Sequence, residues 1–319
     1  MSRLAHIACS LLGTASLLCA APSTAGEIRA LFVGIDDYAP EVDADLKGAV
    51  NDVRFIRERL DHTYKLKLDP FPAAGACEAS GERSITLLTA CAKRAAILAS
   101  FDRLIKASAP GDTVLFYFAG HGAYGPSGTR SGTQSSGKNS SIVAADSRTA
   151  FGDGNIVDDI LDITLKDRID EASAHGVQIA TIFDSCNSGT ATRAANDPTR
   201  AIDPAPANDP ADETLDPSTR WKPRTPPPGI KRATPIHLAA ALDGQKAIEF
   251  GEGANRHGVF TVALADAFSQ NPGATYGDII SDIRSRLSGQ TPAAGELVTV
   301  SRSKPAAQTP VGEIGRAHV

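Results

Sequence analysis

Two residues with the chemistry of a covalent catalyst follow two apolar segments of the chain. His121 comes just after the run at residues 113–119 (TVLFYFA), and Cys186 comes just after the run at residues 177–183 (VQIATIF). A thiolate is a strong nucleophile, and a neighbouring imidazole lowers the pKa of the thiol and donates a proton to a departing amine. This pair of residue types therefore suits hydrolysis of an amide bond, provided that the fold brings the two together.

Small residues surround both candidates. A glycine stands on each side of His121, and a serine and a glycine follow shortly after Cys186. Glycine lets the backbone approach a substrate closely, so the backbone amides of Gly122 and Cys186 are candidates for stabilising the oxyanion of a tetrahedral intermediate. Either residue alone is more often a packed or surface residue, so the prediction rests on their occurring together.

Short apolar runs alternate along the chain with segments of helical periodicity. The predicted strands lie at residues 28–35, 84–89, 113–119, 142–145, 177–183 and 236–242, with a last candidate at 296–301. The predicted helices lie at residues 46–60, 92–108, 165–172, 259–268 and 279–287. This alternation predicts an α/β fold with a mostly parallel sheet of about six strands and helices on both faces. The carboxyl ends of such strands meet at one edge, so we expect His121 and Cys186 to lie close together.

Length and composition are those of an ordinary globular protein. The chain has 319 residues, of which 42 % are hydrophobic and 22 % are charged, and its formal net charge is −5. This charge argues against a nucleic-acid partner held by general attraction to phosphates. The sequence also has no zinc-type spacing of Cys and His, no P-loop and no dinucleotide-binding glycine turn after a strand.

The first 25 residues have the three-part pattern of a secretory signal peptide. Arg3 precedes an apolar stretch at residues 7–21, and small residues stand before a possible cut after Ala25. A membrane anchor or a buried first helix is the alternative. We expect an exported protein, periplasmic or secreted, with no membrane contact once the signal is removed.

Three cysteines remain beyond the expected signal peptide: Cys77, Cys91 and Cys186. An odd number in an oxidising compartment favours one pair and one free thiol. Cys77 and Cys91 flank one short segment and are a candidate disulfide, which leaves Cys186 as the free thiol. The alternative is that all three are small buried apolar residues.

Composition changes between residues 194 and 235, where ten of the 20 prolines lie. A segment this rich in proline forms neither a helix nor a central strand, so we predict an exposed linker. It separates residues 26–193 from residues 236–303 of one interrupted domain. Residues 304–319 are predicted to form a tail without regular structure.

Five segments, in order, resemble the signature motifs of the caspase-like cysteine peptidases, and most closely those of the metacaspases and their bacterial relatives. They are GAVND at residues 48–52, FAGHG at 118–122, FDSCNSG at 183–189, DGQKAIE at 243–249 and GVFT at 258–261. The resemblance covers residues 28–300. It implies a caspase-like three-layer sandwich, with residues 26–193 as the large-subunit region and 236–303 as the small-subunit region. It also implies a cysteine endopeptidase with His121 as general acid/base and Cys186 as nucleophile.

The chain departs from the family pattern at three positions. Ala49, Ala119 and Asn187 stand where family members often carry Cys, Ser and His. None of the three departures removes a member of the implied catalytic pair. By the resemblance, Ala119 and Ala49 would line the specificity pocket, so the detail of that pocket is left open.

The resemblance also implies a substrate preference. Metacaspases with acidic residues at the positions of Asp52 and Asp184 accept Arg or Lys before the cleaved bond, and this chain has both acids. Two carboxylates in a partly dry pocket favour a cation. We therefore expect cleavage of polypeptides after Arg, then Lys. Without the family, Asp52 would be an ordinary charge on a helix surface. The alternative role for Asp184 is that of a third residue that orients His121.

A peptidase of this specificity would also find substrates in its own linker. The linker contains, among its basic residues, Arg200, Arg220, Arg224, Lys231 and Arg232. Autoprocessing there is one hypothesis, and an exposed loop with ordinary charges is the other. The alternative functions of the whole chain are a catalytically silent caspase-fold binding or scaffold protein, and an acyltransferase that uses the same acyl-enzyme.

The chemistry implied by the resemblance requires no cofactor, but some metacaspases need calcium as an activator. Asp153, Asp158 and Asp159 lie in one acidic loop and offer oxygen ligands for this ion. Their spacing is not that of an EF-hand, and a solvated acidic loop is the alternative interpretation.

Overall fold

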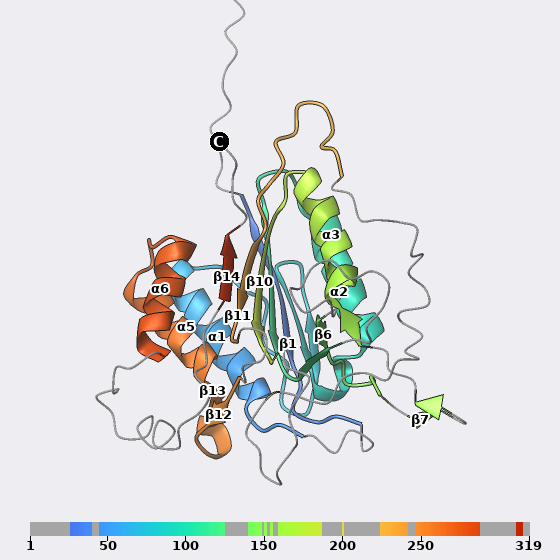
Figure 1. The fold of residues 1–319 in the computed structure, drawn as a ribbon, viewed down its shortest axis with the longest axis vertical. Helices are drawn as coiled ribbons and strands as arrows, with labels where there is room; N and C mark the ends of the chain where they lie inside the picture. Colours follow the sequence, from blue (N-terminus) through green and yellow to red (C-terminus); the bar gives the residue numbers. More distant parts are fainter. Residues whose placement is uncertain are drawn as a thin grey trace, which may run out of the picture.

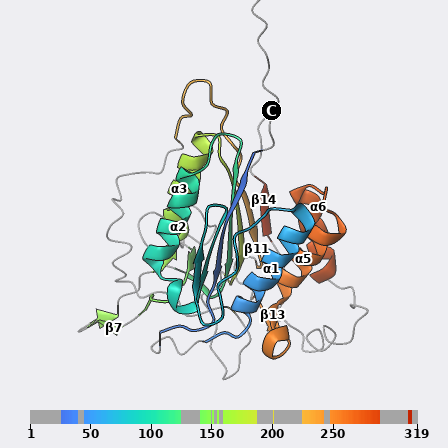
Figure 2. The ribbon, with the colours of Figure 1, turned by 180° about the vertical axis from the view of Figure 1, so that it is seen from behind.

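A central sheet with helices on both of its faces makes up the fold (Figure 1; Figure 2 shows it from behind). The computed structural model describes residues 26–39, 45–124, 140–148, 150–151, 154–155, 159–186, 200, 224–241, 247–287 and 311–314. The expected signal peptide, the candidate strand at 296–301 and most of the predicted linker lie outside these residues. The three-layer α/β fold predicted from the sequence is confirmed.

The main sheet has seven strands among the described residues, in the order β14-β11-β10-β4-β1-β3-β2. Its five central strands are parallel: β1 (Ile28–Gly34), β3 (Ser84–Leu88), β4 (Thr113–Ala119), β10 (Gln178–Asp184) and β11 (Ile236–Ala239). Two antiparallel strands, β2 (Glu78–Ser80) and β14 (Val311–Ile314), form the edges. The sheet is mostly parallel, as predicted, but β14 lies in the tail that we expected to lack regular structure.

Helices cover the two faces of the sheet in separate groups. One face carries α2 (Arg94–Lys106) and α3 (Asp162–Ala174), and the other carries α1 (Ala49–Tyr64), α5 (Val259–Gln270) and α6 (Tyr276–Leu287) (Figure 1). Because both faces are covered, the central strands are continuous apolar runs rather than alternating ones. Phe116, Tyr117 and Phe118 of β4, for example, expose no surface. Within the described part of the chain, no helix is long and apolar enough to cross a membrane.

Short elements form the loops between the larger ones. They are η1 (Thr89–Cys91), β5 (Gly122–Tyr124), β6 (Ser140–Ile142), β7 (Ala150–Phe151), β8 (Gly154–Asn155), β9 (Ile160–Leu161), β12 (Glu249–Phe250), η2 (Gly253–Asn255) and β13 (His257–Gly258). The strand predicted at residues 142–145 is displaced, because β6 ends at Ile142 and pairs with β5 and β9 outside the main sheet.

The register between β4 and β10 sets the geometry of one end of the sheet. The two strands are parallel neighbours, and Ala119 stands opposite Asp184 at their carboxyl ends. His121 and Cys186 each lie two residues beyond this last pair. The prediction that these two residues reach the same edge of the sheet therefore agrees with the observed register.

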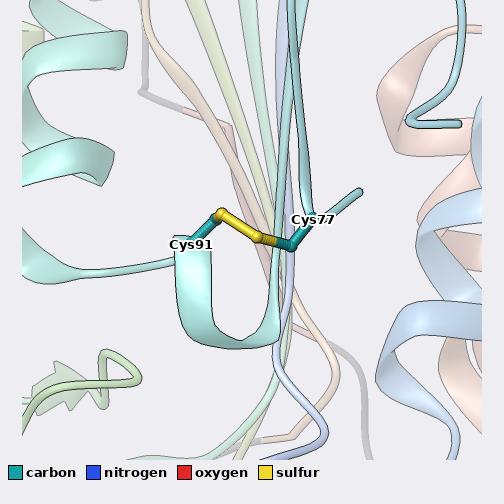
Figure 3. The surroundings of a disulfide bond; sticks show 2 residues. All are labelled: Cys77 and Cys91. Atoms are coloured by element: carbon teal, nitrogen blue, oxygen red, sulfur yellow. A yellow bond between two sulfur atoms is a disulfide. The ribbon is translucent and has the colours of Figure 1, made fainter. Parts of the chain in front are cut away.

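A disulfide joins Cys77, just before β2, to Cys91 at the end of η1 (Figure 3). The two Cα atoms are 5.6 Å apart, and the backbone N–H of Leu88 donates a 2.8 Å hydrogen bond to the Cys77 carbonyl. The candidate pairing from the cysteine count is thus present, and Cys186 is the free cysteine. The bridge ties the short edge strand β2 to the loop that leads into α2.

Replacing both Cys77 and Cys91 by Ser is expected to lower the free energy of unfolding by about 3 kcal/mol, because a closed loop of this length restricts the unfolded chain by that amount. Urea unfolding with and without dithiothreitol measures the loss. The reductant should destabilise the native chain and leave the double variant unchanged. Mass spectrometry shows whether reduction is complete. If the urea midpoint of the fully reduced native chain is unchanged, the expectation is contradicted.

Candidate active site

His121 is held in place through its backbone on both sides. Its N–H donates a 2.7 Å hydrogen bond to the Tyr38 hydroxyl oxygen, and its carbonyl accepts a 3.0 Å bond from the N–H of Val143. The Tyr38 and His121 rings also lie against each other, with centroids 4.7 Å apart. His121 is almost fully buried. These contacts hold the histidine rigidly, just past the end of β4.

Cys186 follows β10 and has no exposed surface. Its Sγ accepts a 2.9 Å hydrogen bond from the N–H of Ala247, in the segment that leads into β12. Burial raises the pKa of the thiol to about 12, although the nearby backbone donors act in the opposite direction. In this state Cys186 is therefore a protonated thiol.

The loops that carry His121 and Cys186 touch at Gly122. A Cβ atom at this position would lie 1.8 Å from the carbonyl oxygen of Cys186, so no residue larger than glycine fits. The backbone N–H of Gly120 also donates to the carbonyl of Asp184, at 3.3 Å. The structure thus brings the two predicted catalytic residues to adjacent loops and explains one of the glycines beside His121.

The backbone of Arg200 lies directly against these loops. Its carbonyl oxygen accepts hydrogen bonds from the N–H groups of Gly122, at 3.0 Å, and Cys186, at 3.3 Å. Its own N–H donates to the carbonyl of Ala247, at 3.0 Å. The two amides that we predicted as oxyanion donors therefore converge on one carbonyl oxygen, and that oxygen belongs to the chain itself.

The side chain of Arg200 fills a buried acidic pocket made by Asp52, Asp184 and Glu249. Nη1 lies 3.2 Å from a carboxylate oxygen of Asp184 and donates to the carbonyl of the same residue, at 2.9 Å. Nη2 lies 3.1 Å from Glu249 and donates to Asp52. Burial alone would lower the pKa of the guanidinium, but the three carboxylates together raise it well above its ordinary value.

Backbone amides hold Asp52 and Glu249 in place. Asp52 lies in the first turn of α1, and both of its oxygens accept from the N–H of Gly258, at 3.1 and 3.0 Å. Glu249, on β12, accepts from the N–H of Gly48, at 3.2 Å, and from Nε of Arg256, at 2.8 Å. Burial opposes the ionisation of Glu249, yet Arg200 and Arg256 lower its pKa. Backbone amides thus fix the position of each carboxylate in addition to its contact with Arg200.

Asp184, the last residue of β10, depends on Thr261 at the start of α5. The Thr261 hydroxyl donates to one carboxylate oxygen at 2.6 Å, the Thr261 N–H donates to it at 3.2 Å, and the Tyr117 hydroxyl lies 2.5 Å from that of Thr261. Burial raises the pKa of Asp184 to about 6 and Asp52 adds to this, while Arg200 acts in the opposite direction. A Cβ atom on Gly258 would lie 2.1 Å from the same oxygen, so glycine is required in this wall of the pocket.

The structure gathers most of the predicted site residues at one place. Its pocket wall contains Asp52 and Asp184, and the fully buried Ala119 stands opposite Asp184 in the sheet. The hydrogen bonds of the Asp184 carboxylate go to Thr261 and Arg200. The expectation that Arg200 belongs to an exposed linker is wrong, because this side chain is fully buried by its contacts with the carboxylates.

Two residues of the buried acidic pocket, Glu249 and Arg200, were not predicted as site residues from the sequence. Glu249 lies within a recognised motif, and Ala247 and Glu249 are two residues apart, so in an extended segment both face the same side. That spacing was the available signal for a third carboxylate. For Arg200 the sequence carries no local signal, because its partners come from three distant segments.

Only one of the three candidate calcium ligands, Asp159, lies among the residues that the structure describes. Asp153 and Asp158 lie outside them, and Asp159 is buried with its carboxylate 2.7 Å from Arg148 and bonded to the Ser141 hydroxyl at 3.0 Å. Within the described ranges, no three His, Cys, Asp or Glu side chains are grouped to hold a metal ion. We therefore derive no chemical step from calcium.

Comparison with known proteins gives matches in both sequence and fold. The family model described as "Metacaspase, peptidase C14 domain" matches residues 28–194. Metacaspase-1 of Pyricularia oryzae is 28 % identical over 173 residues, which are 52 % of this chain and 37 % of that protein. Metacaspase-5 of Trypanosoma brucei brucei is 30 % identical over 171 residues, which are 53 % and 30 %. The chain thus spans only about a third of the length of these relatives.

Two crystal structures share the fold at low sequence identity. A protein of Geobacter sulfurreducens superposes with a TM-score of 0.53 and 17 % identity, over 90 % of this chain and 92 % of that one. Caspase-1 of Spodoptera frugiperda superposes with a TM-score of 0.51 and 9 % identity, over 91 % and 88 %.

Replacing Thr261 by Val is expected to lower the free energy of unfolding by about 1–3 kcal/mol, because the buried Asp184 and Tyr117 each lose a hydrogen-bond partner. Thr261→Ser keeps the hydroxyl and should lose only about 0.8 kcal/mol, the contribution of one buried methyl group. Urea unfolding of the three proteins measures both losses. If the Ser variant were destabilised as much as the Val variant, the hydroxyl would not be what holds Asp184.

Proposed function

Because the chain belongs to the metacaspase, peptidase C14 domain family, we propose that it is a cysteine endopeptidase that cleaves polypeptides after arginine and, less efficiently, after lysine. One observation carries this proposal. A buried guanidinium lies among three carboxylates, and the carbonyl oxygen of the same residue accepts from the N–H groups of Gly122 and Cys186. A substrate arginine in the same position would present its carbonyl to the nucleophile.

The proposed mechanism uses Cys186 and His121. With a substrate arginine in the acidic pocket, Sγ of Cys186 attacks the carbonyl carbon and the thiol proton passes to His121. The amides of Gly122 and Cys186 stabilise the oxyanion, and His121 then protonates the leaving amine. Water hydrolyses the thioester with His121 as base and regenerates the thiol.

The preference for arginine over lysine follows from the shape of the pocket. One terminal nitrogen of the guanidinium meets Asp184, and the other meets Asp52 and Glu249. A planar guanidinium spans these acids with a rigid fork of donors, whereas the single ammonium of lysine cannot be in contact with both sides at once. Lysine should therefore bind, but with fewer of these contacts.

The proposed place of action is outside the cytoplasm, periplasmic or secreted. The signal-like pattern of residues 1–25 suggested export, and the Cys77–Cys91 disulfide supports it, because such bonds persist mainly in oxidising compartments. We propose no required cofactor, and the role of calcium as an activator is decided by assays with and without the ion.

A catalytically silent caspase-fold protein is the second candidate function. The observation that favours it is the state of Cys186, whose thiol is fully buried and has its pKa raised to about 12. A silent protein would keep this thiol unreactive toward an arginine-peptide inhibitor that alkylates cysteine. An endopeptidase would be labelled at Cys186, and His121→Ala would slow that labelling.

The proposal is tested with matched fluorogenic peptides that end in Arg, Lys or Asp. The steady rate of hydrolysis of each peptide is measured with and without calcium. We expect hydrolysis after Arg to exceed that after Lys, none after Asp, and a loss of roughly 10³-fold or more in Cys186→Ala and His121→Ala. Cleavage after Asp would contradict the pocket assignment. No cleavage of any peptide under either condition would leave the silent protein as the better account.

Replacing Glu249 by Gln is expected to lower kcat/KM for the Arg peptide by roughly 10- to 150-fold, because one charge-assisted hydrogen bond to the guanidinium is lost. The effect on the Lys peptide should be smaller, so the ratio of the two values falls. Glu252→Gln, the same change at an exposed position, is the control. Thermal unfolding checks that the fold is kept, and an unchanged Arg-to-Lys ratio would exclude Glu249 from specificity.

A further inference from the structure

Tyr38 brings a third loop to the edge of the sheet where His121 and Cys186 lie. The strands β1 and β4 are parallel neighbours, and Gly34 stands opposite Ala119 at their carboxyl ends. Tyr38 lies four residues beyond Gly34, and His121 lies two residues beyond Ala119. No motif recognised in the sequence included this tyrosine, so its place beside the histidine is a finding of the structure.

The hydroxyl group of Tyr38 supports the histidine loop. Its oxygen accepts a 2.7 Å hydrogen bond from the N–H of His121, and burial raises the pKa of the hydroxyl, so it stays uncharged. The N–H of Tyr38 in turn donates to a carboxylate oxygen of Asp45, at 3.0 Å. A Cβ atom on Gly120 would lie 2.7 Å from the same hydroxyl oxygen, so glycine leaves the room that the tyrosine needs. This contact accounts for the second of the two glycines beside His121.

The ring of Tyr38 lies against the imidazole of His121. The ring centroids are 4.7 Å apart, the two planes are inclined by 44°, and both residues are almost fully buried. An aromatic ring within about 6 Å attracts a cation, and the attraction is stronger where water is excluded. In the proposed mechanism the imidazole becomes a cation when it accepts the thiol proton of Cys186. The tyrosine ring therefore lies where it favours this charged form over the neutral one.

One short segment connects this contact to the acidic pocket. The carboxylate of Asp36 accepts from the N–H of Ala49, at 2.8 Å, in the first turn of α1, which also carries Asp52. Two residues after Asp36, Tyr38 contacts His121. The wall of the pocket and the proposed acid/base are thus held by neighbouring residues of the same loop.

We propose that Tyr38 is a positioning residue for proton transfer, whose hydroxyl holds the loop of His121 and whose ring stabilises the protonated imidazole. This inference rests on the proposed peptidase activity. Tyr38 forms no bond to the substrate, because the thiol proton passes to His121 and from there to the leaving amine. Among the described residues, the hydrogen-bond partners of the pocket acids do not include Tyr38. Its loss should therefore slow proton transfer without weakening the binding of arginine.

Three variants separate the contributions of the hydroxyl and the ring. Tyr38→Phe removes the hydroxyl and keeps the ring, whereas Tyr38→Leu removes both and keeps an apolar side chain. Tyr276→Phe is the matched control, because the half-buried Tyr276 lies by Ile28 and Thr113, at the amino ends of β1 and β4 and so at the opposite end of the sheet. Thermal unfolding checks each fold, and Tyr38→Phe carries the test if the Leu variant does not fold.

The first measurement is the hydrolysis of an Arg peptide by the full chain. We expect kcat to fall by roughly 2- to 10-fold in Tyr38→Phe, because one buried hydrogen bond to the histidine loop is lost. In Tyr38→Leu it should fall by roughly a further 2- to 30-fold, because the charged imidazole also loses the aromatic ring. KM should stay unchanged in both variants, and Tyr276→Phe should match the native chain.

The second measurement is the pKa of the His121 imidazole, followed by NMR of the full chain labelled in its histidines and assigned with His121→Gln. Tyr38→Leu should lower this pKa by roughly 0.4–1.5 units, and Tyr38→Phe by less, because the ring favours the cation. Other titratable and charged side chains act on Tyr38 or lie beside the site, and they are the same in every variant, so their effect cancels in the comparison. They are Arg200, Asp36, Asp184, Cys186 and Glu249.

Different results separate this inference from the proposed function. An active native chain whose kcat is unchanged in Tyr38→Leu would overturn the inference and leave the peptidase in place. The same holds if Tyr276→Phe loses as much activity, if only KM changes, or if the imidazole pKa is unmoved or raised when the ring is removed. If the native chain hydrolyses no Arg peptide, the proposed function fails, and the role of Tyr38 in proton transfer fails with it.

Discussion

The burial of three carboxylates around one cation is the constraint on which the rest of the site depends. Asp52, Asp184 and Glu249 together expose almost no surface, and unpaired charges are very costly away from water. The pocket is stable only while a cation fills it and while amides of Gly48, Gly258 and Thr261 hold its acids. An empty pocket, or one filled by a group without a positive charge, would leave these buried charges unpaired and is therefore unfavourable.

The sheet supplies the precision that this pocket needs. The register of β4 against β10 places two loops side by side, and the N-terminus of α1 and the β12–β13 hairpin bring the remaining acids to the same edge. The carboxylate of Asp36, just after β1, accepts from the N–H of Ala49 at 2.8 Å and so fixes the start of α1. Four separate parts of the chain thus meet at one edge of the sheet.

The fold and the proximity of the His121 and Cys186 loops were predictable from the sequence because both depend on local signals. Apolar runs marked the parallel strands, and His121 and Cys186 stood directly after two of them. The position of Glu249 in the site was harder to predict, because the two-residue strand β12 is too short to show a periodic pattern of apolar residues. Arg200 could not be found, because a basic residue among prolines has the composition of an exposed linker and its burial depends on acids distant in sequence. The strand β14 was also missed, because it is short and is a strand through its pairing with β11, which is distant in sequence.

The burial of Cys186 has a consequence for sulfur chemistry within one small domain. The chain holds an oxidised pair, Cys77 and Cys91, together with a free thiol. Thiol–disulfide exchange and oxidation to sulfenic acid both require a thiolate that is accessible. The thiol of Cys186 has no exposed surface, and burial raises its pKa to about 12, so it is neither accessible nor ionised. The covered thiol of Cys186 is thereby protected from mispairing and from oxidants under the conditions that form the disulfide.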